Sequence, residues 1–188
     1  LAAGPTTAIE VTFGGDDETA IRPVLLAALE GILSAMGVDQ VTLVNALIIA
    51  EERGIHHARK MAAPEPGFET TVSMTLETGV GRVRVAGALV GDSRGRVIRI
   101  DDYDVDVAPE GWMLVIRNRD VPGVIGNVGT LLGGSGINIG SYHQARLSVP
   151  GQEALAAITV DQAPPEGVLR ALERVPDVLL VRLAQLGD

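Results

Sequence analysis

Hydrophobic and polar residues alternate along several segments of the first half of the chain. Ile9, Val11 and Phe13 alternate with other residues, as in a strand, and Gly37 and Gly54 each follow a segment with helical spacing. The pattern predicts a strand at residues 8–13, helices at 23–36 and 42–53, and strands at 72–76, 83–90 and 97–100. Turn residues separate the last three strands, so an antiparallel meander is expected there.

A different order of elements is expected in the second half. The pattern predicts a strand at residues 113–118, a helix opened by Pro122-Gly123, a strand pair at 137–147 and 154–160 around Pro150-Gly151, a helix begun by Pro164-Pro165 and a strand at 178–183. This β-α-β-β-α-β order is typical of the ferredoxin-like fold. The sequence therefore predicts an α+β protein of two domains: an antiparallel-sheet domain at residues 1–108 and a ferredoxin-like domain at residues 109–188.

Composition narrows the possible functions. With 188 residues the chain fits two small domains, and with 3% aromatic residues its core must be aliphatic. The absence of cysteine excludes disulfides, thiolate metal sites and a cysteine nucleophile. A net charge of −9 argues against nonspecific nucleic-acid binding. Because no apolar run approaches the ~20 residues of a membrane helix and no signal peptide is visible, a cytoplasmic location without membrane contact is expected.

Two motifs that often mark enzymes have structural explanations. Gly91-Asp92-Ser93-Arg94-Gly95 matches the G-x-S-x-G pattern of hydrolases, but that motif must join a strand to a helix, and here strands are expected on both sides. The glycines between Gly126 and Gly136 lack the lysine of a P-loop, no G-x-G-x-x-G occurs, and neither half is expected to form a parallel dinucleotide-binding sheet. No catalytic residue and no nucleotide site are therefore predicted.

Residues 51–60 gather two adjacent histidines and three cations in an otherwise acidic chain. Neighbouring histidines on an extended chain point to opposite sides, and no H-E-x-x-H spacing is present, so no metal site is expected. The segment is a candidate site for an anion such as phosphate or a carboxylate. The alternative is a solvated helix end whose cations complement the helix dipole.

The segment from Asn118 to Gly126 has the chemistry of an amino-acid site. A strand ends, the chain turns at Pro-Gly, and a helix begins with unpaired backbone N–H groups that favour a carboxylate. Asn118 and Asp120 beside this helix start are candidates for an ammonium group, and Asn138 offers a further donor and acceptor. In the alternative interpretation, Asn118 and Asp120 are turn-forming residues that cap the helix.

These motifs resemble a known family. N-x-D-x-P-G-V-I-G-x-V-G-T-L-L at residues 118–132, followed by Ile137-Asn138-Ile139, resembles the ACT domain, and more narrowly the ACT domain that ends D-3-phosphoglycerate dehydrogenases. Residues 44–46 and 50–55 resemble the intervening, allosteric-substrate-binding domain of the long form of that enzyme. The junction at residues 99–111, R-I-D-x-Y-x-V-D-x-x-P-x-G, resembles it too. The resemblance covers essentially the whole chain and keeps the order of both domains.

The resemblance implies feedback regulation of serine biosynthesis. In the family, ACT domains pair side by side into a continuous sheet and bind L-serine at the interface, so a homo-oligomer is implied. The implied ligands for L-serine or another small amino acid are the side chains of Asn118, Asp120 and Asn138 and the backbone of Val124 and Ile125. Family members vary at the first two positions, which leaves the affinity open. The intervening domain can bind an anionic effector, for which charge suggests Arg53, His56, His57, Arg59, Lys60 and Arg94.

The same resemblance bears on catalysis. The NAD-binding and substrate domains of this oxidoreductase family precede the matching region, so no cofactor is expected in this chain and it should be inactive alone. Two alternatives remain. One is an assembly module that pairs through an open sheet edge without a ligand. The other is the regulatory part of an iron–sulfur L-serine dehydratase, which the tyrosine-containing junction at residues 99–111 disfavours.

Overall fold

The computed structural model describes residues 4–91, 94–147 and 153–187, and the chain forms two compact units, one up to Gly95 and one from Arg96 onward. The first unit contains β1 (Thr6–Gly14), α1 (Ile21–Ala35), α2 (Ala46–Glu52), β2 (His56–Ala62), β3 (Thr71–Thr78) and β4 (Gly81–Val90). β5 (Arg94–Ile100) begins in the first unit and continues in the second. The second unit also contains β6 (Tyr103–Val107), β7 (Trp112–Arg119), α3 (Val124–Gly134), β8 (Ile139–Arg146), β9 (Glu153–Val160), α4 (Glu166–Glu173) and β10 (Val178–Gln185). The predicted α+β class with two domains is confirmed.

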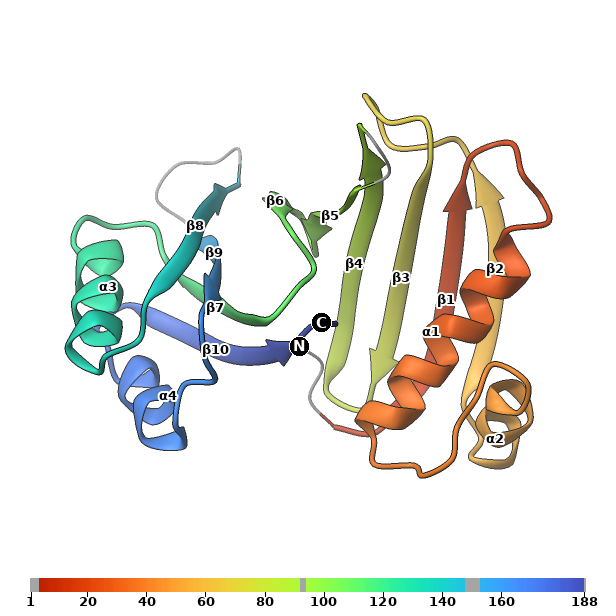
Figure 1. Ribbon diagram of the computed structural model, residues 1–188, viewed down its shortest axis with the longest axis horizontal. Coiled ribbons are helices and arrows are strands. Elements are labelled where there is room, and N and C mark those ends of the chain that lie inside the picture. The colour runs from red at the N-terminus through yellow and green to blue at the C-terminus, as the bar shows by residue number, and fades with distance from the viewer. Residues whose placement is uncertain (1–3, 92–93, 148–152, 188) are drawn as a thin grey trace. The chain divides into compact units, whose positions relative to one another are not determined.

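The sheet of the first unit has the strand order β2-β1-β3-β4, and both helices lie on one of its faces (Figure 1). The alternation seen in the sequence explains this arrangement, because Ile9 and Val11 of β1 are buried against Leu25, Leu29 and Leu33 of α1. The small residues Ala46 and Ala50 let α2 join the same core. Polar residues of the strands consequently lie on the face opposite the helices.

β2 is a strand that the hydrophobic pattern did not predict. It runs parallel to β1, with Ala8 opposite His56 and Gly14 opposite Ala62. All of its residues except His57 are exposed, so burial leaves no alternating signal in the sequence. Because a parallel pair needs a long crossover, α1 and α2 form the connection.

α2 also begins later than predicted, at Ala46 instead of residue 42. The side-chain oxygen of Asn45 accepts hydrogen bonds from the backbone N–H of Thr42 at 2.7 Å and from its hydroxyl at 3.1 Å. Such local side-chain bonds compete with helical ones, so residues 42–45 form a turn.

The second unit has the predicted ferredoxin-like order. Its sheet runs β10-β7-β9-β8 with antiparallel neighbours, and α3 and α4 cover one face (Figure 1). The core beneath the helices joins Leu114 and Ile116 of β7 and Ile158 of β9 to Leu132 of α3 and Leu172 of α4, all fully buried. Trp112, at the start of β7, is half-buried against this core.

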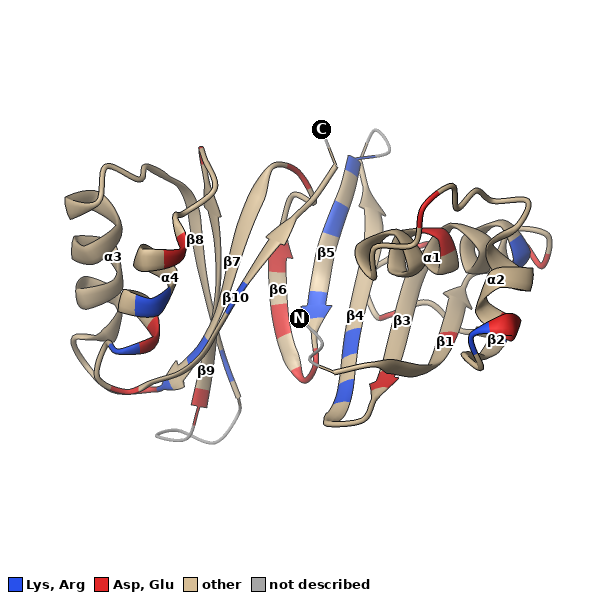
Figure 2. Cartoon of the chain, turned by 90° about the horizontal axis from the view of Figure 1, so that it is seen from below, with Lys and Arg blue, Asp and Glu red and all other residues tan. Residues whose placement is uncertain are grey.

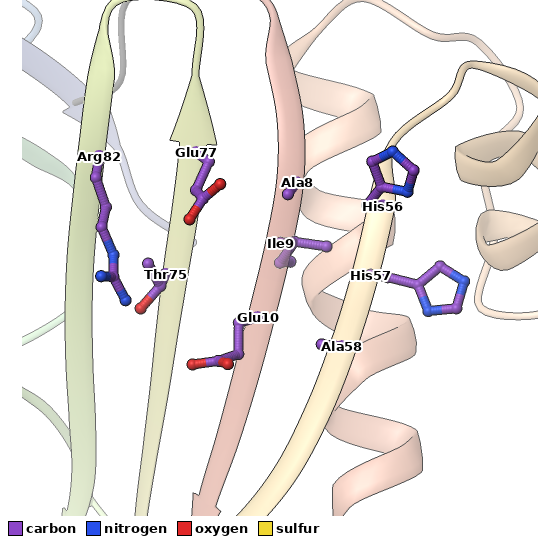
Figure 3. Close-up of a pocket in the computed structure, with 9 residues that line it drawn as sticks. All are labelled: Ala8, Ile9, Glu10, His56, His57, Ala58, Thr75, Glu77 and Arg82. Atoms are coloured by element: carbon purple, nitrogen blue, oxygen red, sulfur yellow. The ribbon is translucent and has the colours of Figure 1, made fainter.

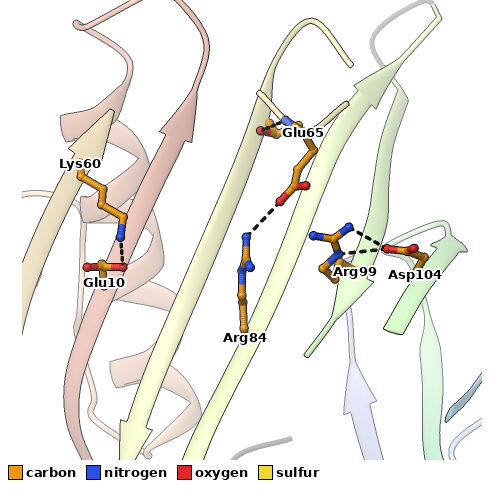
Figure 4. Close-up of polar contacts among 7 residues, drawn as sticks. Glu10, Lys60, Glu65, Arg84, Arg99 and Asp104 are labelled. Atoms are coloured by element: carbon orange, nitrogen blue, oxygen red, sulfur yellow. Dashed lines mark hydrogen bonds and ion pairs between the residues drawn. The ribbon is translucent and has the colours of Figure 1, made fainter. Parts of the chain in front are cut away.

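The other face of that sheet is covered by β5 and β6. Tyr103, Val105 and Val107 of β6 are buried and pack with Met113 and Leu155 in a second cluster. β6 was not predicted as a strand, although its apolar residues alternate with aspartates, because aspartate has a low strand propensity. The exposed Asp104 and Asp106 form ion pairs with Arg99 and Arg96 of β5, respectively. Figure 2 shows acidic positions along β6 beside basic positions along β5, and Figure 4 shows the pair of Arg99 and Asp104.

Some predicted features lie outside the described residues, namely Asp92 and Ser93 of the G-x-S-x-G motif and the Pro150-Gly151 turn. β4 ends at Val90 and β5 begins at Arg94, so a strand stands on each side of that motif. Among the described helices, none is both long and apolar enough to cross a membrane. Within the same residues, no three acidic or histidine side chains gather as a metal site would need.

Candidate functional site

Asn118 is a buried amide at the end of β7, and its side chain is only partly satisfied. The residue is 2% exposed, and its Nδ2 donates a hydrogen bond to the backbone oxygen of Arg119 at 2.6 Å. Its Oδ1 is buried and accepts no hydrogen bond from any described residue. A buried acceptor without a donor costs about 1–3 kcal/mol, so a ligand that supplied a donor here would gain binding free energy.

Asp120 supplies a carboxylate directly beside Asn118. Its side chain is 17% exposed, and its Oδ1 lies 3.1 Å from Nε of Arg146, the last residue of β8. Arg146 is well exposed, so this ion pair lies at the surface end of the site. Arg146 was not a sequence candidate, because the contact depends on β9 lying between β7 and β8 in the sheet.

The start of α3 is the third part of the site. Gly123 precedes the helix with a φ of 97°, a left-handed conformation that suits glycine, and no side chain caps the helix. The first helical hydrogen bond runs from the N–H of Asn127 to the oxygen of Gly123, so the amides before Asn127 have no intrahelical acceptor. α3 carries no charged residue (Figure 2), so no charge within the helix opposes its backbone dipole, whose N-terminal end favours a carboxylate. The alternative that Asn118 or Asp120 caps α3 is wrong.

The remaining candidates of this site do not all meet in one copy of the chain. Val124 is buried and Ile125 is exposed, both in the first turn of α3. Asn138 precedes β8, and its Nδ2 donates to Oδ2 of Asp161 at 2.8 Å. β9 pairs with β7 on one side and with β8 on the other. Asn118 of β7 lies opposite Ala154 of β9, whereas Ile139 of β8 lies opposite Val160 of β9. Six residues of strand separate those positions, about 20 Å. Asn138 is therefore at the opposite end of the sheet from Asn118 and Asp120.

The cationic candidates of the first unit divide between the two faces of its sheet. Because alternate residues of the strand β2 point to opposite faces, His56 and Lys60 lie on the face opposite the helices, and His57 and Arg59 lie on the helix side. The two histidines are drawn in Figure 3. Lys60 Nζ forms an ion pair with Glu10 at 2.7 Å (Figure 4), and His57 Nε2 lies 3.3 Å from a carboxylate oxygen of α2.

The other two cations of this set lie apart from β2. Arg53 follows the last residue of α2, and Arg94 opens β5, four strand positions from β2, or about 19 Å. The six residues therefore do not form one site. The alternative of a solvated helix end fits Arg53 alone.

Among the described residues, two of the three pockets that adjoin β2 contain His57. The first, about 210 Å³ on the face opposite the helices, is lined by Ala8, Ile9, Glu10, His56, His57, Ala58, Thr75, Glu77 and Arg82 (Figure 3). Its two carboxylates oppose an anion. The second, about 360 Å³, lies among α1, α2 and β2 and is lined by Arg22, Leu25, Leu26, Leu47, His57, Ala58 and Arg59. Arg22 was not a sequence candidate, because only the fold brings α1 beside β2. Of the two, this second pocket has the chemistry for an anion.

Comparison with known proteins agrees with both halves of the chain. Residues 1–101 match the family model of the D-3-phosphoglycerate dehydrogenase intervening domain, and residues 112–177 match the ACT domain. The chain is 32% identical over 180 residues to a D-3-phosphoglycerate dehydrogenase of Synechocystis sp., covering 95% of the chain and 32% of that protein. It is 29% identical over 186 residues to the enzyme of that name in Methanocaldococcus jannaschii, covering 97% of the chain and 34% of the relative.

A third relative, the D-3-phosphoglycerate dehydrogenase of Bacillus subtilis, is 30% identical over 160 residues, covering 85% of the chain and 30% of that protein. The chain thus spans about a third of the length of the curated relatives it matches. The resemblance found at residues 44–55 and 118–132 is confirmed. The chain belongs to the D-3-phosphoglycerate dehydrogenase family and carries that family's intervening domain followed by a regulatory ACT domain.

Proposed function

We propose that the second unit binds L-serine, or another small α-amino acid, at the start of α3 and between two copies of the chain. Binding there regulates the dehydrogenase of serine biosynthesis to which the chain contributes. The effector's carboxylate bonds to the free amides of α3, and its ammonium group bonds to Asp120 and to Oδ1 of Asn118.

One observation carries this proposal: a buried Asn118 oxygen without a donor, beside a mostly buried carboxylate and an uncapped helix start. The Asn118 oxygen has no donor and no side chain caps the helix start, whereas Asp120 is paired with the exposed Arg146. An α-amino acid carries the complementary carboxylate and N–H donors within one small molecule.

The position of Asn138 supports a site shared by two copies. β8 is an edge strand of its sheet, so its outer side can pair with another strand. If the β8 strands of two copies pair antiparallel about a two-fold axis, the direction of the second strand is reversed. Asn138 of one copy then lies at the end of the sheet where Asn118 and Asp120 of the other copy lie.

A shared site explains how binding regulates. A ligand shifts a conformational equilibrium only by its difference in affinity for the two states. An amino acid held by groups from two copies binds the paired state and not the separated one, so it stabilises pairing.

NAD chemistry is proposed only for the part of the relatives that this chain does not match. The sequence contains no G-x-G-x-x-G, and among the strand pairs whose register is described, only β1 and β2 are parallel. The proposal therefore assigns no dinucleotide-binding site of the G-x-G-x-x-G type to the described units.

Calorimetry with L-serine tests the proposal. We expect the chain to bind L-serine with measurable heat at millimolar ligand, and we expect Asp120→Ala to lower the affinity about 10- to 100-fold, because it removes a charged acceptor. Circular dichroism checks that the variant stays folded. Glu166→Ala is the matched control, since Glu166 is an exposed carboxylate in the first turn of α4 in the same unit and should not alter binding.

Two results would contradict the proposal. Unchanged L-serine affinity in Asp120→Ala would place the ligand elsewhere. No heat from the unmodified chain, with an oligomeric state independent of ligand in sedimentation, would favour the assembly module that needs no effector.

A further inference from the structure

Gln144 of β8 is a half-buried amide in the second unit, and its side chain is incompletely satisfied. Gln144 lies opposite Ala156 of β9 and two residues after Tyr142. Tyr142 packs against the core beneath the helices. Gln144 is therefore on the face that α3 covers. Its Oε1 is buried and accepts no hydrogen bond from any described residue.

Gln144 and Asn118 lie on the two sides of β9, and the residues between them are small. Ala154 and Ala156 of β9 are fully buried, and they lie opposite Asn118 and Gln144 respectively. With neighbouring strands about 4.8 Å apart, the backbones of β7 and β8 are about 10 Å apart.

Side chains of β8 do cross this interval. Arg146, on the same face of β8 as Gln144, reaches Asp120 with its Nε at 3.1 Å. Gln144 lies two residues before Arg146 along β8, toward the middle of the strand. Its side chain therefore lies beside that of Arg146, on the face that α3 covers and one row of the sheet away from Asn118.

We propose that Oε1 of Gln144 accepts a hydrogen bond from a hydroxyl on the effector's side chain, and that it thereby selects hydroxyl-bearing amino acids over alanine. The inference rests on the proposed function. The groups at the surface end of the site bind the ammonium and carboxylate common to all α-amino acids, so they do not discriminate among side chains. Gln144, deeper in the sheet, faces the side chain. A buried acceptor that only one ligand can satisfy favours that ligand.

Titrations of the chain with L-serine and L-alanine test this inference. We expect the unmodified chain to prefer L-serine about 5- to 100-fold. Gln144→Leu introduces a side chain of similar volume without an acceptor. It should lower the affinity for L-serine by the same factor and change the affinity for L-alanine by no more than about twofold. Tyr142→Phe is the control, since it changes a neighbour on the same strand and face and should preserve the ratio.

A purely structural role for Gln144 predicts something different. In that case Gln144→Leu would lower the urea midpoint of unfolding and weaken both ligands equally. On the proposed role the midpoint stays equal or rises, because an unpaired buried acceptor is removed. Gln144→Met, which keeps an unbranched side chain, gives the same comparison if the leucine variant does not fold.

The outcomes separate the two proposals. If the unmodified chain binds L-serine and Gln144→Leu retains the preference over L-alanine, the role of Gln144 is overturned and the site at α3 stands. If the unmodified chain binds neither amino acid, the proposed function is overturned, and this inference with it.

Discussion

The two amide oxygens of Asn118 and Gln144 contrast with the tyrosines of the same unit, because burial acts on them in different ways. An amide without a donor stays neutral, so its burial lowers stability at every pH until a ligand binds. A buried phenol responds instead through its pKa. Burial raises the pKa of Tyr142, and burial followed by the charge of Glu153 raises that of Tyr103, above the usual 10.0.

The tyrosine shifts give a prediction for alkaline pH. Because the folded-state pKa values are raised, the neutral phenols favour the folded state fully below pH 10.0, and this contribution is lost as pH rises through the raised values. We expect the tyrosinate absorbance of the folded chain to titrate at a higher pH than that of the urea-unfolded chain. Tyr103→Phe isolates the signal of Tyr142. A folded-state midpoint at or below the unfolded one would contradict the prediction.

At the scale of elements, α3 depends on one backbone conformation. Gly123 has a φ of 97° directly before the helix, where an L side chain is strained. Gly129 lies inside the same helix, and an added Cβ would meet nothing within 4 Å. The two glycines therefore differ in conformation and not in available space.

Alanine substitutions measure that difference. We expect Gly123→Ala to lower the free energy of unfolding by about 1–2 kcal/mol, because it forces an L residue into a left-handed conformation. Gly129→Ala should raise it by about 0.5–1 kcal/mol, because alanine is the better helix former. Urea unfolding followed by circular dichroism measures both. Equal effects of the two substitutions would show that φ at Gly123 does not limit stability.

The elements that the sequence predicted are those whose apolar residues recur with a clear period, which include β1, α1 and the whole β-α-β-β-α-β order of the second unit. β2 was missed because it is exposed, and β6 because aspartate, which has a low strand propensity, occupies its alternate positions. Asn118 and Asp120 were identifiable because they adjoin the helix start in sequence. Arg146 and Gln144 were not, since they reach the site only across β9.

At the scale of the whole molecule, the distance of about 20 Å between Asn118 and Asn138 makes one copy insufficient for the proposed site. A single amino acid is far shorter, since consecutive Cα atoms lie about 3.8 Å apart. Asp120 and Asn138 must then act from different copies of the chain, although both belong to the same sheet.

Mixing two variants that each bind L-serine weakly tests this requirement. Asp120→Ala and Asn138→Ala should each bind L-serine weakly alone. After the two are unfolded and refolded together, mixed pairs contain one intact site, so about one quarter of the normal number of sites should return. Calorimetry counts those sites. A mixture that binds no better than its components would contradict a site shared in this way.

Because Trp112 lies in the second unit, that unit can be followed by its own spectroscopic signal. Trp112 is the chain's one tryptophan, and both tyrosines, Tyr103 and Tyr142, also belong to the second unit. Intrinsic fluorescence and near-ultraviolet dichroism above the phenylalanine bands therefore arise from that unit alone, whereas far-ultraviolet dichroism includes the helices and strands of both. Recording the two signals in one unfolding experiment separates the stabilities of the units without any label. We expect an effector that binds at α3 to raise the unfolding midpoint recorded by fluorescence, because that signal reports the unit that binds it.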